Sequence, residues 1–557
     1  MAATTIPARP EVFTRQSSGL VRVMSPYSAF VYNILTMGLI FPWTYLWAPG
    51  ALPGGNLVWG ILLATLIEIP IAFSYVWLST ALPRSGGDYV FQSRVFGGGI
   101  AFTVVFSGFV IWILQWVALS GWLVSYLGFA PLFLGLGATM GNPALSSLGV
   151  FFTTPTGIII VSILNALLSL VLLVSGFKNY VRFQHVMWIG TLLAFFVVFI
   201  ILFTTPPSEF VSRLNAFAVA SGGAPNFYET AVSAVQGAGI DLLPPFSLLA
   251  TLLVAPIAWT SLQWATYSAQ QNGEIKDARS IRSQTFIMVG SLIATGLLLA
   301  LLAVGIQRVA PPEFLTVAGA GYWSLIAEAN INGFNLWPPI IAVALAASPL
   351  VVLIIGIGYI LNGFQIVCNC YIGMTRVLVA MSLDRLLPEW LSRVNDRLHT
   401  PVNAHIAYFV ASLPIILGYN LVTQPFTWTS LTLGVTFGCG YVFVVTCLAG
   451  ALLPYRAKEV YEASPGAHYK IGGYPLVTVL GGIGAVLGII MVAAFLFSPE
   501  LGVLGVWNFE DFPNHLWAQI IAFAIIVLSA ALYLYFKQRQ KARGINVEYA
   551  FKEIPPE

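Results

Sequence analysis

The stretch that decides the fold is NILTMGLIFP, residues 33–42, which lies inside the first long apolar run of the chain, residues 26–47. As a helix, this run is roughly 33 Å long at about 1.5 Å per residue, enough to cross a bilayer. A helix that only anchors the protein in the membrane would not need Gly38 and Pro42 in its middle, because glycine weakens a helix and proline removes a backbone donor. Backbone groups freed in hydrocarbon need partners, so a broken helix survives where it lines a cavity or packs in protein. The stretch therefore predicts a binding site for a solute or an ion. The alternative is a kink that serves helix packing, since glycine and proline are both common in spanning helices.

The composition around this stretch is that of an all-α integral membrane protein. Of the 557 residues, 58% are hydrophobic and 8% are charged, against roughly 25% charged in soluble domains. Apolar runs of about 20 residues or more, bounded by proline, glycine and charge, are typical of spanning helices. The sequence predicts twelve of them, at residues 26–47, 58–82, 98–128, 155–176, 181–204, 245–270, 284–306, 345–374, 402–420, 427–453, 474–497 and 515–536.

The basic residues are distributed unevenly between the two sides of these spans. If the N-terminus lies inside, twelve spans put the C-terminus inside as well. Of the 24 lysines and arginines, all except Arg213 and Arg308 then lie on the inner side. This is the bias that sets the orientation of membrane proteins. We therefore expect a multi-pass protein of the cell membrane with both termini in the cytoplasm.

The segments outside the spans have distinct characters. Residues 1–25 form a polar cytoplasmic tail without a cleavable apolar core. Residues 205–244 form an outer segment rich in glycine, alanine and proline. Residues 537–557 form a basic tail suited to the anionic lipids of the inner leaflet.

Ionisable and polar side chains inside the spans are candidates for ion coupling. Glu68 is the one charge near the middle of a span, where an unpaired charge costs about 3 kcal/mol, so it faces the bundle interior. It is either a proton-linked carboxylate, or a carboxylate that is tied to neighbouring polar groups or simply held protonated. Sodium would instead need carbonyls of the first span together with Thr191, Asn362 or Asn369. Asn362 and Asn369 lie seven apart on one helix face and could equally bond across helices.

Three sequence motifs carry a resemblance to a known family. PRSGGDYVF at 83–91 resembles the loop after the second helix of amino acid–polyamine–organocation (APC) superfamily permeases. TRVL at 375–378, DRLLP at 384–388 and TPVNA at 400–404 together resemble the stretch from helix eight into helix nine. A weaker match is GEIKDAR at 273–279, which is similar to the turn after helix six.

The resemblance implies a LeuT-type fold, in which two five-helix repeats are inverted in the membrane and helices one and six are broken. The repeats would be residues 26–204 and 245–454, followed by two further helices within 455–536. The sequence agrees, because the sixth span has its own polar interruption, AWTSLQW at 258–264. Ends of half-helices attract carboxylates and cations, which suits a zwitterion. The family's glycine-rich breaks are reduced here to Gly38, so less backbone is open to a ligand.

We therefore predict a secondary-active transporter of a small organic solute, an amino acid or related amine, that works by alternating access coupled to a proton or sodium gradient. The alternatives are a carrier of another solute such as a nucleobase, and a sensor or scaffold that keeps the fold without transport. In the third span, Trp112, Gln115 and Trp116 share a face that either lines the site or packs. The candidate solute-binding residues are Asn33, Thr36, Met37, Gly38, Trp112, Gln115, Trp259, Thr260, Ser261 and Gln263; the candidate ion-coupling residues are Glu68, Thr191, Asn362 and Asn369.

The sequence lacks the motifs of enzymes and of cofactor sites. It has no phosphate-binding loop, no HExxH zinc motif and no GxSxG nucleophile turn. All four cysteines fall inside spans, where they serve as small apolar residues. We expect no catalytic residue, no cofactor, no bound metal and no nucleic-acid partner. The partners expected are the solute, the coupling ion and membrane lipid, and the sequence leaves open whether the protein is a monomer or a homodimer.

Overall fold

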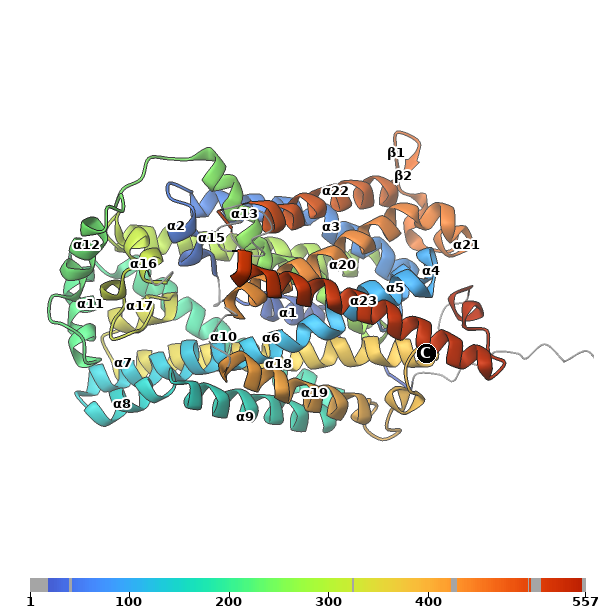
Figure 1. The fold of residues 1–557 in the computed structure, drawn as a ribbon, viewed down its shortest axis with the longest axis horizontal. Coiled ribbons are helices and arrows are strands. Elements are labelled where there is room, and N and C mark those ends of the chain that lie inside the picture. The colour runs from blue at the N-terminus through green and yellow to red at the C-terminus, as the bar shows by residue number, and fades with distance from the viewer. Residues whose placement is uncertain are drawn as a thin grey trace, which may run out of the picture.

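The computed structural model describes residues 19–39, 43–322, 325–421, 428–498, 500–501 and 512–552. Long helices lie side by side in one bundle (Figure 1). Within the described residues, eleven helical runs are long and apolar enough to cross a membrane. The fold is therefore all-α and multi-pass, as predicted.

These eleven runs are built from the following elements: α3 (Leu57–Ala81); α5 (Gly98–Val105), η2 (Phe106–Ile111), α6 (Trp112–Leu123), η3 (Val124–Phe129) and α7 (Ala130–Met140) in one run; α9 (Pro155–Val174); α10 (Phe177–Thr204); α13 (Leu248–Leu262) with η4 (Gln263–Glu274); α14 (Ile281–Thr285), η5 (Phe286–Gly290) and α15 (Ser291–Val309) in one run; α18 (Pro349–Leu383); α19 (Val402–Leu421); α20 (Trp428–Arg456); α22 (Leu476–Phe497); and α23 (Phe512–Ala542).

The shorter elements are α1 (Pro26–Met37), η1 (Trp43–Tyr45), α2 (Trp47–Ala51), α4 (Gly87–Phe96), α8 (Pro143–Phe151), α11 (Pro207–Ala220), α12 (Phe227–Gly237), α16 (Phe314–Tyr322), η6 (Ala327–Ala329), α17 (Pro338–Leu345), η7 (Glu389–Ser392), α21 (Lys458–Glu462), η8 (Pro465–His468) and η9 (Val547–Lys552). A two-stranded antiparallel hairpin pairs β1 (Lys470–Ile471) with β2 (Tyr474–Pro475).

The first predicted span is interrupted, as the sequence indicated. Its helix α1 is capped at its start by Ser25, whose hydroxyl accepts from the Ser28 amide at 3.1 Å. It ends after twelve residues at Gly38, whose φ of 76° and ψ of 104° favour glycine. Twelve residues span about 18 Å, too short to cross a bilayer alone. This is why the first span is not among the eleven crossing runs and why the count of twelve stays a prediction; Pro42 lies outside the described residues.

The second predicted interruption is a change of winding. The α-helix α13 continues through Trp259 to Leu262 without a gap. At Gln263 it becomes the 3-10 helix η4, inside which Gln271 leaves helical geometry. A 3-10 helix has poorer backbone hydrogen bonds, and long runs of it are uncommon. The break thus lies at the end of the predicted stretch and not at its centre.

The third span is longer than predicted. Its helical run continues past residue 128 to Met140, although Pro131 lies in its path. A proline ring clashes with the carbonyl four residues back in a regular α-helix. Here the turns just before it, η3, are π-helical. Their wider pairing relieves that clash, so the helix passes through the proline.

The connecting segments gather at one end of the bundle. The segments 205–244 and 307–340 carry α11, α12, α16 and η6, and α17 begins at the end of the second segment. In Figure 1, α11, α12, α16 and α17 lie together at the left end, opposite α4 and α21. Arg213 and Arg308, the two basic residues expected outside, belong to α11 and to the end of α15. The segments therefore form a helical cap.

Candidate solute-binding site

The two interrupted helices meet at Asn33. Its side-chain amide donates to the Ser268 hydroxyl at 3.0 Å and to the Ile287 carbonyl at 3.1 Å. Its side-chain oxygen accepts from the Ser268 amide at 2.9 Å. Because Asn33 is fully buried and both ends of its amide are occupied, it joins α1 to η4 and η5.

Asn369 joins α18 to the end of α1. Its side-chain nitrogen donates to the Thr36 hydroxyl at 2.6 Å. Its side-chain oxygen accepts from the Tyr180 hydroxyl at 2.6 Å and from Gln365 at 2.9 Å. The bond across helices, which the sequence left open beside ion coupling, is thus present at Asn369.

A small cavity lies where α1, α6, η4 and α18 meet. Its volume of about 20 Å³ is enough for about one water molecule. An amino acid needs more room, so transport requires these helices to separate. The lining residues are Thr36, Ile113, Trp116, Trp264, Tyr267, Ile366 and Cys370.

Two of the lining residues carry a buried polar atom that has no hydrogen-bond partner among the described residues. These atoms are Trp116 Nε1 on α6 and Tyr267 Oη on η4. Each such atom costs about 1–3 kcal/mol when it stays unsatisfied. The two atoms therefore suit water or a polar solute group in the cavity. Six further unpartnered atoms of the same two elements belong to residues outside the lining: Trp112 Nε1, Gln115 Nε2, Gln263 Oε1, Thr266 Oγ1, Gln270 Oε1 and Gln271 Oε1.

On α6, the residues at the cavity are Ile113 and Trp116, which share a face because they are three apart. Trp112 and Gln115 are not among the lining residues. Trp112 instead packs on α20, where a Cβ at Gly438 would lie 2.4 Å from its ring. Trp116 belonged to the expected aromatic face, but the sequence could not show which of its members turns toward the solute.

On α13 and η4, the residues at the cavity are Trp264 and Tyr267, which lie beyond the predicted Trp259–Gln263. The Thr260 hydroxyl donates to the Ile257 carbonyl at 2.7 Å. The Thr260 carbonyl accepts from Trp264 Nε1 at 3.0 Å. Met37 of α1 and Ser261 of α13 are buried and lie outside the lining. Sequence reasoning missed Ile113, Tyr267, Ile366 and Cys370. Residues of these types are common in any spanning helix, and Tyr267 lies beyond the polar stretch 258–264 that the sequence pointed to.

Glu68 lies apart from the cavity and has one partner. Trp259 Nε1 donates to its Oε2 at 2.6 Å, and both side chains are fully buried. Its Oε1 has no partner within the described part of the chain. The contact joins α3 to α13. Trp259 therefore belongs to the surroundings of Glu68 and does not line the cavity.

Of the remaining ion-coupling candidates, Asn362 contacts α1 near its broken end, and Thr191 lies on α10. Asn362 Nδ2 donates to the Leu35 carbonyl at 3.2 Å. Asn362 Oδ1 and Thr191 Oγ1 are buried, and neither has a partner among the residues described. Carbonyl, amide and hydroxyl oxygens are the ligands that hard cations prefer.

The PRSGGDYVF segment holds η4 in place through its backbone and through Asp88. The Gly86 amide donates to the Gln270 carbonyl at 2.9 Å. A Cβ at Gly87 would lie 2.9 Å from the Ala269 carbonyl oxygen, so glycine permits this close approach. Asp88 accepts from Tyr75, from Gln270 and, at 2.5 Å, from Thr446. Burial raises the pKa of Asp88, and these three hydrogen bonds oppose the rise.

A buried ion pair holds the C-terminal end of η4. Arg376 Nε and Nη2 donate to the two carboxylate oxygens of Glu274 at 2.7 and 2.8 Å. The guanidinium carbon lies 4.9 Å from the ring centre of Phe177. The pair therefore ties the end of η4 to α18.

The chain also resembles known proteins in sequence. A family model described as "Amino acid permease" matches residues 27–528. The chain is 24% identical to the branched-chain amino acid permease BcaP of Lactococcus lactis, over 78% of this chain and 81% of that protein. It is also 24% identical to an uncharacterized transporter of Legionella pneumophila, over 82% of this chain and 87% of that protein.

Proposed function

The chain belongs to the amino acid permease family, and we therefore propose that it carries a small apolar α-amino acid by alternating access in the cell membrane, with both termini in the cytoplasm. It is a membrane transporter of amino acids and not an enzyme. The observation that carries the choice of solute is the cavity at the end of α1. Its walls are mostly apolar and aromatic, with Ile113, Trp116, Trp264 and Ile366 among them.

The polar atoms around the cavity suit the two charges of such a solute. The C-terminal end of α1 carries a partial negative charge, which attracts an ammonium group. The unpartnered donors Trp116 Nε1 and Tyr267 Oη are available to a carboxylate. The name of the Lactococcus relative, a branched-chain amino acid permease, supports an apolar side chain.

Uptake into proteoliposomes tests the choice of solute. We expect leucine, isoleucine and valine to be accumulated, and lysine, putrescine and uracil to be rejected. Accumulation of only the amine or the nucleobase would replace the proposed solute. If no solute is moved under a proton or a sodium gradient, the chain is a sensor or scaffold on the permease fold.

Widening the cavity should change solute preference. In Ile366→Ala we expect the ratio of phenylalanine to valine uptake to rise about tenfold, because a small change in an apolar pocket is worth about 1–3 kcal/mol. The matched control is Val367→Ala, which shortens a fully buried neighbour outside the lining. Competition of labelled leucine uptake by both amino acids measures the ratio. An equal change in both variants would show that Ile366 does not contact the solute.

We propose that protons drive accumulation and that Glu68 carries them. In Glu68→Gln we expect loss of accumulation under a pH gradient, while exchange of internal for external solute continues, since exchange needs no net proton movement. Trp259→Phe, which removes the hydrogen bond at 2.6 Å and keeps the carboxyl, should retain pH-driven accumulation with a displaced pH profile. If Glu68→Gln keeps pH-driven uptake and sodium removal abolishes it, coupling belongs to Thr191 and Asn362.

A further inference from the structure

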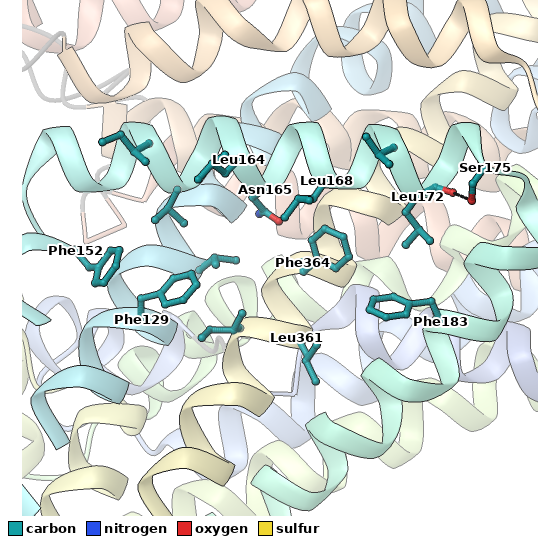
Figure 2. A pocket seen from close by; sticks show the side chains of 15 residues that line it. Phe129, Phe152, Leu164, Asn165, Leu168, Leu172, Ser175, Phe183, Leu361 and Phe364 are labelled. Carbon is teal, nitrogen blue, oxygen red and sulfur yellow. Dashed lines mark hydrogen bonds between the residues drawn. The ribbon is translucent and has the colours of Figure 1, made fainter. Parts of the chain in front are cut away.

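A large cavity lies between α9, α10 and α18, away from the solute site. Its volume is about 690 Å³, and Figure 2 shows its walls with Asn165 among them. Ile360, Leu361 and Phe364 of α18 line it, whereas Ile366 and Cys370 of the same helix line the solute cavity. We propose that this cavity binds a neutral, chain-like apolar molecule, and that Asn165 recognises one hydrogen-bond-accepting oxygen within its chain.

The walls exclude a charged ligand. None of the lining residues is acidic or basic, and four of them are phenylalanines: Phe129, Phe152, Phe183 and Phe364. The polar side chains of the lining are Asn165 and Ser175. The Ser175 hydroxyl already donates to the Leu172 carbonyl at 2.7 Å. Asn165 is therefore the polar side chain of the lining that keeps an unused hydrogen-bond donor.

The Asn165 side chain is both buried and unsatisfied. The residue is 5% exposed, and its Nδ2 has no partner among the described residues. Figure 2 shows its amide extending into the cavity beside Leu168 and facing Phe364. A donor in such surroundings gains free energy from any acceptor that reaches it.

The depth of Asn165 in the membrane limits which ligand oxygens can reach it. It is the eleventh residue of the twenty in α9, so it lies about 15 Å from either end, near the middle of a hydrocarbon core of about 30 Å. The oxygens of a phospholipid lie in the headgroup region and do not reach this depth. An oxygen inside an apolar chain, such as a mid-chain carbonyl, does.

The shape of the cavity favours a chain over a second protein. Along α9 the lining runs from Ile160 to Ser175, about 22 Å at 1.5 Å per residue. Leu164 and Leu168, on either side of Asn165, are 51% and 57% exposed and face the membrane. The amide is recessed between them, so a helix from another copy would meet the leucines first. A slim chain can enter between them.

A matched pair of ligands tests the proposal. The full chain in nanodiscs is titrated with hexadecan-8-one and with hexadecane, which differ by one mid-chain carbonyl, and thermal unfolding reports binding. We expect the ketone to bind about fivefold more tightly than the alkane, because one hydrogen bond contributes a factor of about that size. In Asn165→Leu the two ligands should bind equally, whereas Asn403→Leu, at an exposed amide of α19, should keep the preference. Leu168→Trp should weaken both by filling the entrance.

Three outcomes would overturn the proposal. Equal binding of ketone and alkane by the unmodified protein would remove Asn165 as a recognition group. A preference that survives Asn165→Leu would place the carbonyl elsewhere. A dimer that dissociates in Asn165→Leu, with no binding of either ligand, would assign the cavity to a second copy of the chain.

Discussion

Gly38→Leu is expected to abolish solute uptake while the protein still inserts and runs as a monodisperse peak. Gly38 ends α1 with a φ of 76° and a ψ of 104°, and residues with a side chain pay about 1–3 kcal/mol in such regions. Its amide donates to the Ile34 carbonyl at 3.0 Å. A changed turn would move Thr36, which lines the solute cavity. Uptake of labelled leucine and stabilisation by leucine in thermal unfolding both measure the loss.

The control for Gly38 separates backbone strain from damage to the site. Gly239 has nearly the same φ, 77°, and open space around it, in the outer segment. Gly239→Leu therefore imposes a similar local strain away from the cavity and should leave uptake close to normal. Full leucine stabilisation in Gly38→Leu would mean that the break in α1 is only a kink and that the solute binds elsewhere.

The second large effect is expected at the buried pair of Glu274 and Arg376. Both side chains are 1% exposed. Removing one partner leaves a buried charge uncompensated, which costs about 3–5 kcal/mol. We therefore expect Glu274→Gln and Arg376→Met each to lower the unfolding temperature strongly. The double variant should be less destabilised than the sum of the two, because neither charge is then left alone.

An exposed pair provides the comparison for this measurement. Lys458 and Glu462 are 3.7 Å apart, with exposures of 72% and 61%. Exposed pairs of this kind contribute little, about 0.3–0.5 kcal/mol, so Glu462→Gln should hardly change the unfolding temperature. If Glu274→Gln unfolds at the same temperature as Glu462→Gln, the packing of η4 against α18 does not depend on the ion pair.

The positions of the long helices could be predicted because a span is a local property. The apolar runs of the sequence correspond to eleven helical runs in the described residues, and the break at Gly38 has the backbone geometry that a glycine there suggests. The family resemblance was also confirmed, since its motifs depend on residues close together in the chain. The inverted repeat and the orientation stay predictions.

The sequence by itself therefore determined that this is a multi-pass permease and roughly where its helices run, because a spanning helix must be apolar over about 20 consecutive residues and must satisfy its backbone within itself. The tertiary structure decided which side of each helix meets the solute. In it, Trp116 faces the cavity and Trp112 packs against Gly438. Asn33, which was expected to bind the solute, instead forms hydrogen bonds that join two helices. The physical reason is that in a chain apolar all round, a helix's rotation is set by contacts with its neighbours, which no local pattern records.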